Sequence, residues 1–196
     1  MRIVVFGDSI AAGFYDYEKS GWVSRLNASI MCPKPFVEVY NRSVSGDTTN
    51  EVSERVERDC KSIKPDIVIF QAGSNDVTYD PLAKKTRVST KECRSNIFKL
   101  IKLGKQFTDK VIFTGLFWVD EKVANPWSEK EYYYNKDGKA YDQIIQEVCK
   151  KERICFIPMF DVLSSELLED GVHPNAKGHQ KIFEIVRDYL KKEKLI

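Results

Sequence analysis

The chain has 196 residues, of which 42% are hydrophobic and 31% are charged, a balance that is ordinary for one globular domain of this length. Its 31 basic and 29 acidic residues leave a net charge of +2, too even to favour nucleic acid or an anionic membrane surface as a partner. No stretch approaches the length of a membrane span, and the chain enters a predicted strand at once, without a signal-like segment. We therefore predict a single domain over residues 1–196, with no nucleic-acid partner and no membrane span.

Short apolar runs alternate with helical patterns along the whole chain. Apolar runs rich in β-branched residues predict strands, and apolar residues at helical spacing predict helices. The predicted strands cover residues 3–6, 36–40, 66–71, 110–115 and 153–157, and the predicted helices lie around residues 20–26, 52–63, 93–101, 141–148 and 182–189. This alternation favours an α/β fold with a parallel sheet that is covered on both faces.

Polar loops that contain glycine follow the first three predicted strands. Gly7-Asp8-Ser9 comes after the first strand, Ser45-Gly46 after the second and Gly73-Ser74-Asn75 after the third. In a parallel sheet the carboxyl ends of the strands share one edge, which is where ligand sites form. The three loops are therefore expected to meet at one site.

Ser9 lies where the first predicted strand gives way to the start of a helix or turn. Backbone N–H groups at a helix start have no intrahelical partner and favour negative charge. A serine in this place is suited to act as an acyl-transfer nucleophile if a base reaches it. The alternative is that Ser9 only caps the helix, since serine and aspartate are both good caps. The shared placement of the three polar loops favours the nucleophile.

The base that such a serine needs must come from one of two histidines, His173 and His179. His173 lies in a turn-rich loop with Asp170 three residues before it, so the carboxylate could orient one ring nitrogen while the other faces Ser9. His179 falls near the start of the last predicted helix, where packing or solvent exposure is the simpler interpretation. Two histidines and one aspartate at this spacing are thin evidence for a metal site.

A tetrahedral oxyanion needs hydrogen-bond donors, and three candidates lie in the polar loops. These are the backbone N–H groups of Ser9 and Gly46 and the side-chain amide of Asn75. The alternative for Gly46 and Asn75 is ordinary turn chemistry, which both sequences favour. Each signal is weak by itself, and the ordered set is much stronger.

In this ordered set the chain resembles the SGNH (GDSL) hydrolase family of esterases and lipases. Four blocks carry the resemblance: Gly7-Asp8-Ser9-Ile10, Val44-Ser45-Gly46-Asp47, Gly73-Ser74-Asn75-Asp76 and Asp170-Gly171-Val172-His173-Pro174. Ile10 stands where the family's name-giving signature has leucine. The resemblance implies a flavodoxin-like three-layer α/β/α sandwich with a five-stranded parallel sheet, in one SGNH hydrolase domain.

The resemblance also implies a role for each matching residue. Ser9 becomes the nucleophile, Asp170 and His173 complete a catalytic triad, and the Ser9 amide, Gly46 and Asn75 form an oxyanion hole. The implied reaction is the cleavage of carboxylic esters or thioesters. Because the family accepts varied esters, no particular substrate follows.

Two other functions fit the same sequence in part. An acyltransferase would use the same residues but pass the acyl group to a sugar or another alcohol instead of water. A non-catalytic binding module on a flavodoxin-like scaffold would not require the nucleophile, base and oxyanion donors together. A flavin site finds no support, because the loop after the first strand lacks the Ser, Thr and Gly run expected to cradle a phosphate.

Aromatic residues crowd the segment after the fourth predicted strand, namely Phe117, Trp118, Trp127, Tyr132, Tyr133 and Tyr134. They fit either a wall of the substrate pocket or a hydrophobic lip packed on the domain. The segment is too short for a large lid, so we expect a small or short-chain acyl ester as the partner. Formation of a homo-oligomer is left open.

The cysteines bear on the cellular compartment. Their number is odd and they show no metal-binding spacing; they are Cys32, Cys60, Cys93, Cys149 and Cys155. Most fall on apolar faces of predicted elements, where cysteine packs as a small hydrophobic side chain. We expect reduced thiols, a cytoplasmic protein, and neither a metal nor another cofactor.

Overall fold

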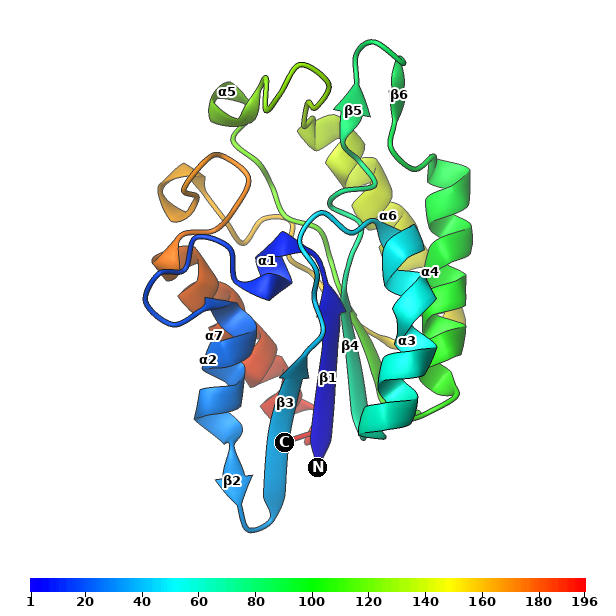
Figure 1. Cartoon of the computed structure of the whole chain (residues 1–196), viewed down its shortest axis with the longest axis vertical. Coiled ribbons are helices and arrows are strands. Elements are labelled where there is room, and N and C mark those ends of the chain that lie inside the picture. The colour runs from blue at the N-terminus through cyan, green and yellow to red at the C-terminus, as the bar shows by residue number, and fades with distance from the viewer.

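A six-stranded sheet in the order β2-β3-β1-β4-β7-β8 forms the centre of the computed structural model (Figure 1). The structure describes the backbone of residues 1–196 and the side chains of residues 1–32 and 34–196. Five strands run parallel: β1 (Arg2–Gly7), β3 (Phe36–Asn41), β4 (Ile67–Gln71), β7 (Val111–Thr114) and β8 (Cys155–Ile157). The sequence-based prediction of a five-stranded parallel sheet is thereby confirmed.

One strand was not expected from the sequence. It is β2 (Cys32–Pro33), which lies between the first predicted helix and the second predicted strand and pairs antiparallel with the start of β3. This short hairpin covers the outer edge of β3, and so limits the unpaired backbone that an edge strand exposes.

The chain reverses its direction of travel across the sheet beside β1. It begins at β1, moves outward to β3, and then returns to β4 on the other side of β1 before continuing to β7 and β8. Ile3 pairs in register with Val39 of β3 and with Ile67 of β4. Such a reversal leaves a crevice at the carboxyl ends of the adjacent strands, where α/β proteins bind ligands. The loops after β1, β3 and β4 open onto this crevice.

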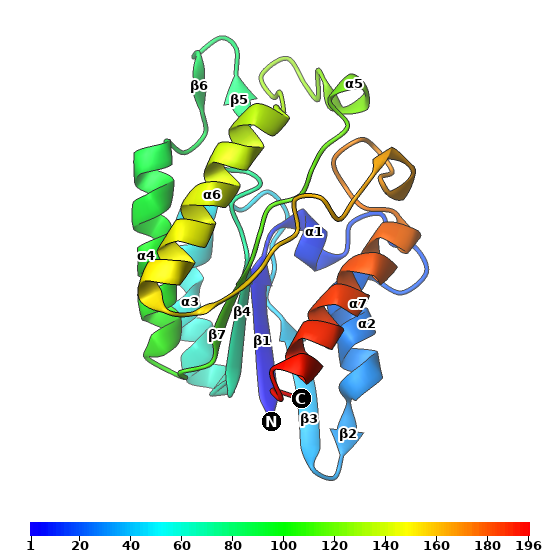
Figure 2. The ribbon, with the colours of Figure 1, turned by 180° about the vertical axis from the view of Figure 1, so that it is seen from behind.

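Helices cover both faces of the sheet, as the two opposite views show (Figures 1 and 2). One face carries α3 (Thr49–Ile63), α4 (Thr90–Lys105) and α6 (Asn135–Glu152), and the other carries α2 (Gly21–Ile30) and α7 (Ala176–Lys192). Shorter elements gather at the carboxyl ends of the strands. They are α1 (Ser9–Ala12), the hairpin of β5 (Tyr79–Asp80) and β6 (Lys85–Thr86), α5 (Glu121–Ala124) and the 3-10 turn Ser165–Leu167. The three-layer α/β/α arrangement predicted from the sequence is confirmed.

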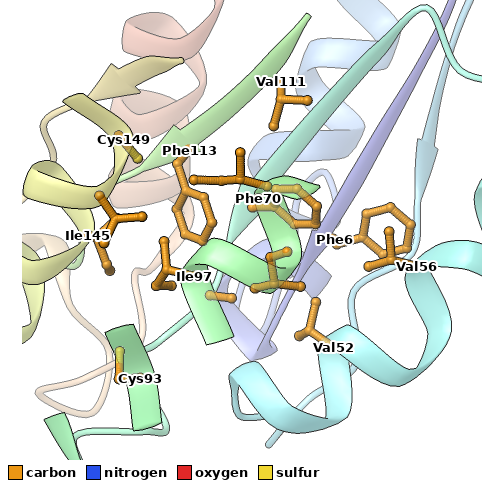
Figure 3. Close-up of a cluster of buried hydrophobic side chains, with 14 of the residues drawn as sticks. Phe6, Val52, Val56, Phe70, Cys93, Ile97, Val111, Phe113, Ile145 and Cys149 are labelled. Atoms are coloured by element: carbon orange, nitrogen blue, oxygen red, sulfur yellow. The ribbon is translucent and has the colours of Figure 1, made fainter. Parts of the chain in front are cut away.

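Alternation along the strands divides the core into two halves. Phe6 of β1 stacks on Phe70 of β4, and Phe70 packs on Phe113 of β7, with ring centroids 5.7 and 5.4 Å apart. Figure 3 shows these rings among side chains of α3, α4 and α6. Ile3 and Val5 of β1 point to the opposite face of the sheet from Phe6 and pack against α2 and α7. Burying each such side chain contributes about 1.5–3 kcal/mol to folding, so both faces hold the sheet in place.

The last helix differs from its prediction in detail. The helical spacing of Ile182, Ile185, Val186 and Tyr189 predicts that all four are buried, but Ile185 and Tyr189 are only half-buried. Phe183 and Leu190 are buried in their place. The buried stripe is thus rotated slightly around α7, because the helix packs against α2 as well as against the sheet.

The cysteine thiols are free, and three of them lie in the core. Burial raises the pKa of Cys60 and of Cys149 to about 12 and raises that of Cys93 as well, so these thiols stay protonated and unreactive at neutral pH. Among the described helices, we find none with the length and apolar character needed to cross a bilayer.

Candidate active site

The turn between β1 and α1 presents Ser9 to the crevice. Asp8 caps α1, because its Oδ1 accepts the Ile10 N–H at 3.0 Å, and Ser9 is the first residue of the helix. The capping role that competed with the nucleophile role therefore falls to the preceding aspartate. This leaves the Ser9 hydroxyl free for another partner.

A chain of hydrogen bonds joins three side chains from distant parts of the sequence. The Ser9 Oγ lies 2.8 Å from His173 Nε2, and His173 Nδ1 lies 2.8 Å from Asp170 Oδ2. Ser9 and His173 are buried, with 7% and 8% of their surface exposed. The three residues predicted from the sequence as a triad are thus brought together in the order that proton transfer from the serine requires.

Asp170 is held by its own loop before it meets the histidine. Its Oδ1 accepts the backbone N–H groups of Val172 and His173 at 2.9 and 2.7 Å. Partial burial acts to raise the pKa of the Asp170 carboxyl, but the hydrogen bonds from the His173 side chain and the two N–H groups outweigh burial and lower the pKa. The carboxylate therefore stays charged and fixes the imidazole ring.

The predicted oxyanion donors lie in the loops after β1, β3 and β4. Among the described residues, neither the Ser9 N–H nor the Gly46 N–H donates a backbone hydrogen bond. The Asn75 Nδ2 donates to the Asp47 carbonyl at 3.0 Å, which uses one of its two hydrogens. Gly46 has φ +85°, and a Cβ there would meet no atom within 4 Å. Glycine is thus needed here for its backbone angle rather than for close approach.

Arg55 holds the Gly46 loop in place. Its Nη2 contacts Asp47 Oδ2 at 2.6 Å and the Gly7 carbonyl at 3.2 Å, and Arg55 also donates to the Arg42 carbonyl. Arg55 thereby connects the loop after β3 to the end of β1, just before Ser9. The sequence gives no sign that Arg55 has this role. The segment between Asp47 and Arg55 combines a loop with the first turns of α3, so their separation matches no regular spacing.

Comparisons with known proteins show which family the chain belongs to. The model of the GDSL-like lipase/acylhydrolase family matches residues 5–181, which is nearly the whole chain and includes Ser9, Asp170 and His173. The chain belongs to this family. It is accordingly a GDSL-type serine ester hydrolase, as the sequence predicted.

Individual relatives are distant but extensive. An arylesterase of Vibrio mimicus is 25% identical over 97% of this chain and 88% of its own length. An acetylxylan esterase of Geobacillus stearothermophilus is 26% identical over 91% of this chain and 88% of its own length. A solved lipase/acylhydrolase of Enterococcus faecalis, 24% identical, superposes with a TM-score of 0.78 over 98% of this chain and 96% of that one. This structural likeness shows the shared fold.

Asp8, the residue before Ser9, lies in the core of the site. Asp8 is fully buried, and its Oδ1 also accepts a hydrogen bond of 3.0 Å from Gln71 Nε2 at the end of β4. Its Oδ2 has no partner among the described residues. Burial, which outweighs these hydrogen bonds, raises the pKa of Asp8. Gln71 was missed by the sequence analysis, although its place at the end of a predicted strand was a usable signal.

His179, the second histidine, packs in the core, which is one of the two non-catalytic placements expected from the sequence. It is fully buried in the first turns of α7, and its Nε2 lies 2.9 Å from the Phe14 carbonyl. Burial lowers the pKa of this imidazole, so the neutral ring donates to the carbonyl. Among the described residues, no group of three or more His, Cys, Asp or Glu side chains could hold a metal ion.

A small apolar pocket lies beside Ser9 and His173 of this GDSL hydrolase. Its lining includes Ile10 and Val172, which adjoin Ser9 and His173, together with Leu116, Phe117 and Tyr133. Its volume is about 30 Å³, which exceeds the minimum that one water molecule needs. Phe117 and Tyr133 of the aromatic segment thus form part of the wall of this pocket, and a role in binding substrate stays a prediction.

Asp76, the last residue of the third family block, anchors the loop that carries Asn75. Its two carboxylate oxygens accept the Thr49 N–H at 2.8 Å and the Thr49 hydroxyl at 2.6 Å at the start of α3. Burial raises the pKa of Asp76 from 3.8 to about 6, despite these hydrogen bonds. The folded state therefore binds this proton more tightly than the unfolded state does, and the associated stability is lost as pH rises from about 4 to about 6.

We expect Asp76→Asn to remove this pH dependence, because the amide keeps the shape but does not titrate. Relative to wild type, the variant's free energy of unfolding should rise by about 3 kcal/mol between about pH 4 and about pH 7. Urea titrations of both proteins at several pH values measure this difference. A difference that stays constant with pH would show that Asp76 titrates normally.

Proposed function

We propose that the protein cleaves carboxylic esters or thioesters through a covalent acyl-enzyme on Ser9. The observation that carries the proposal is the continuous hydrogen-bonded chain from Ser9 Oγ through His173 to Asp170. In the first half-reaction, Ser9 Oγ attacks the acyl carbon while its proton moves to His173 Nε2. The bond from the acyl carbon to the alcohol oxygen then breaks, and His173 gives the proton to the leaving alcohol.

In the second half-reaction, water removes the acyl group from Ser9 by the corresponding steps. His173 takes a proton from water, the oxygen of that water bonds to the acyl carbon, and the bond to Ser9 Oγ breaks. The serine recovers its proton from His173, so the enzyme is regenerated and a carboxylic acid leaves. Asp170 stays charged throughout, which its lowered pKa supports, and stabilises the imidazolium formed in each half.

The negative charge on the tetrahedral intermediate needs donors that are already in place. The unpaired N–H groups of Ser9 and Gly46 and the second hydrogen of the Asn75 amide are the proposed donors. Preorganised donors of this kind stabilise the transition state more than the ground state, because they need not reorient during the reaction.

A small or short acyl group fits the apolar pocket beside Ser9. Leu116, Phe117 and Tyr133 line part of this pocket, and its volume of about 30 Å³ leaves little room for a long chain. Acetyl esters should therefore be cleaved faster than octanoyl esters of the same alcohol. A series of acyl lengths on one alcohol tests this, and product analysis with added acceptor alcohols separates hydrolysis from acyl transfer.

Replacing Asn75 by alanine should lower kcat by roughly 10²–10³-fold and change KM little, as expected for an oxyanion donor. Steady-state kinetics and a melting curve on one purified variant measure both effects. If Asn75 only supports the turn through its bond to the Asp47 carbonyl, the melting temperature should fall while kcat stays near that of wild type.

A further inference from the structure

Three aromatic rings surround the imidazole of His173. The ring centroids of Phe14, Tyr15 and Trp127 lie 5.5, 5.6 and 5.5 Å from that of His173. Phe14 and Tyr15 come from the loop between α1 and α2, and Trp127 comes from the segment after α5. Phe14 is 47% exposed and Trp127 is 36% exposed, so both present apolar ring surface to solvent at the mouth of the site.

The chemistry determines which part of an ester these rings meet. His173 Nε2 must hand its proton to the oxygen of the departing alcohol, so that oxygen lies within hydrogen-bond reach of the imidazole. The acyl carbon, in contrast, is bonded to Ser9 Oγ. Rings packed around His173 therefore border the alcohol part of the substrate.

A groove with a mixed polar and apolar lining continues from Tyr15 along the surface. Tyr15 lines it together with Tyr17, and the other lining residues are Glu18, Glu166, Glu169, Asn175, Ala176 and Lys177. Its volume of about 330 Å³ falls in the range of small-molecule sites, about 300–1,000 Å³. Both ribbon views place the loop between α1 and α2 beside the segment that leads into α7 (Figures 1 and 2). Residues of these two segments line the groove.

The loop that supplies the aromatic side of the groove is anchored by buried polar contacts. Arg25 Nε and Nη2 bind the two carboxylate oxygens of Asp16 at 3.0 Å each, and both side chains are almost fully buried. Arg25 also donates to the Ala176 carbonyl at 3.2 Å, and His179 holds the Phe14 carbonyl. A surface fixed in this way loses little conformational entropy when a ligand binds.

The residue types in the groove point to a ligand that is both ring-shaped and rich in hydroxyl groups. A sugar ring presents apolar C–H faces that pack on aromatic rings, and its hydroxyls donate to carboxylates and accept from an ammonium group. The groove offers all three partners in Tyr17, Glu18 and Lys177. A cationic alcohol would gain from the carboxylates but not from Lys177, and a plain hydrocarbon ring would leave both kinds of charge unused.

Given the esterase function proposed above, we propose that the alcohol part of the substrate is a sugar that packs on this aromatic loop and extends into the groove. Tyr17 tests this sharply, because 83% of it is exposed and its removal leaves the core intact. Phe36 provides the matched control, since it is also an exposed aromatic residue but begins β3 at the opposite end of the sheet.

The experiment compares kcat/KM for four acetyl esters: a monoacetylated methyl glycopyranoside, cyclohexyl acetate, acetylcholine and ethyl acetate. Wild type should prefer the glycoside, and Tyr17→Ala should lower the glycoside-to-ethyl-acetate ratio by roughly tenfold, the effect of losing one aromatic contact. Tyr17→Phe should keep most of the ratio, and Phe36→Ala should leave it at the wild-type value.

The possible failures have different meanings. If ethyl acetate is cleaved but Tyr17→Ala leaves the ratio unchanged, the groove does not bind the alcohol and the proposal is wrong. Cyclohexyl acetate as good as the glycoside would exclude recognition of hydroxyls, and a salt-sensitive preference for acetylcholine would replace the sugar by a cation. Failure to cleave any of the four esters would instead count against the esterase function on which the proposal rests.

Discussion

Replacing Ser9 by alanine should lower kcat by about 10⁶-fold, the loss seen for the nucleophile of a characterised serine protease. The size follows from the mechanism, because no acyl-enzyme can form without Ser9 Oγ. What remains is catalysis by the donors that still surround the oxyanion. Steady-state kinetics on the most active ester of the series measures the loss, and a melting curve checks that the variant is folded.

Covalent labelling gives an independent measurement of the same assignment. A fluorophosphonate reacts when a serine oxygen bonds to phosphorus and fluoride leaves, with His173 taking the serine proton. Wild type should be labelled at Ser9 alone, and Ser9→Ala should not be labelled. Ser45→Ala, which removes an exposed serine of the neighbouring loop, should be labelled like wild type. A label on a different serine of folded wild type would refute the assignment.

The positions of Ser9, Asn75 and His173 could be predicted because they depend on local patterns. The apolar run of β1 ends at glycine, so the strand end and the residues after it are visible in the sequence. Parallel strands then place their loops at a common edge whatever their separation along the chain. With only two histidines, the turn-rich loop and Asp170 three residues earlier favoured His173 over His179 as the candidate base.

Other parts of the site depend on contacts that no local pattern records. The rings of Phe14 and Trp127 meet at His173 from two separate loops, and neither loop has a periodic signal. Arg55 reaches the end of β1 only because α3 packs beside it. The choice of Asp8 over Ser9 as the cap depends on which side chain can bond to the Ile10 N–H, and both residue types are good caps.

The second large effect should come from Asp170→Asn, a change of one atom. We expect kcat/KM to fall by about 10⁴-fold, as for the equivalent change in a characterised serine protease, with little loss of stability. The backbone explains why so small a change is so costly. The Val172 and His173 N–H groups both donate to Asp170 Oδ1, so the asparagine must keep its carbonyl oxygen in that position.

The new amide nitrogen then takes the place of Oδ2, 2.8 Å from His173 Nδ1. Because this NH₂ group can only donate, Nδ1 must accept, and the proton of the neutral imidazole moves to Nε2. An Nε2 that already carries a proton cannot take one from Ser9, so the nucleophile is left unactivated although every atom is nearly in place. A matched comparison of kcat/KM and melting temperature for wild type and Asp170→Asn tests this. If Asp170 only stabilised its own loop by accepting the backbone N–H groups, asparagine would do so equally well, and the variant would keep nearly full activity.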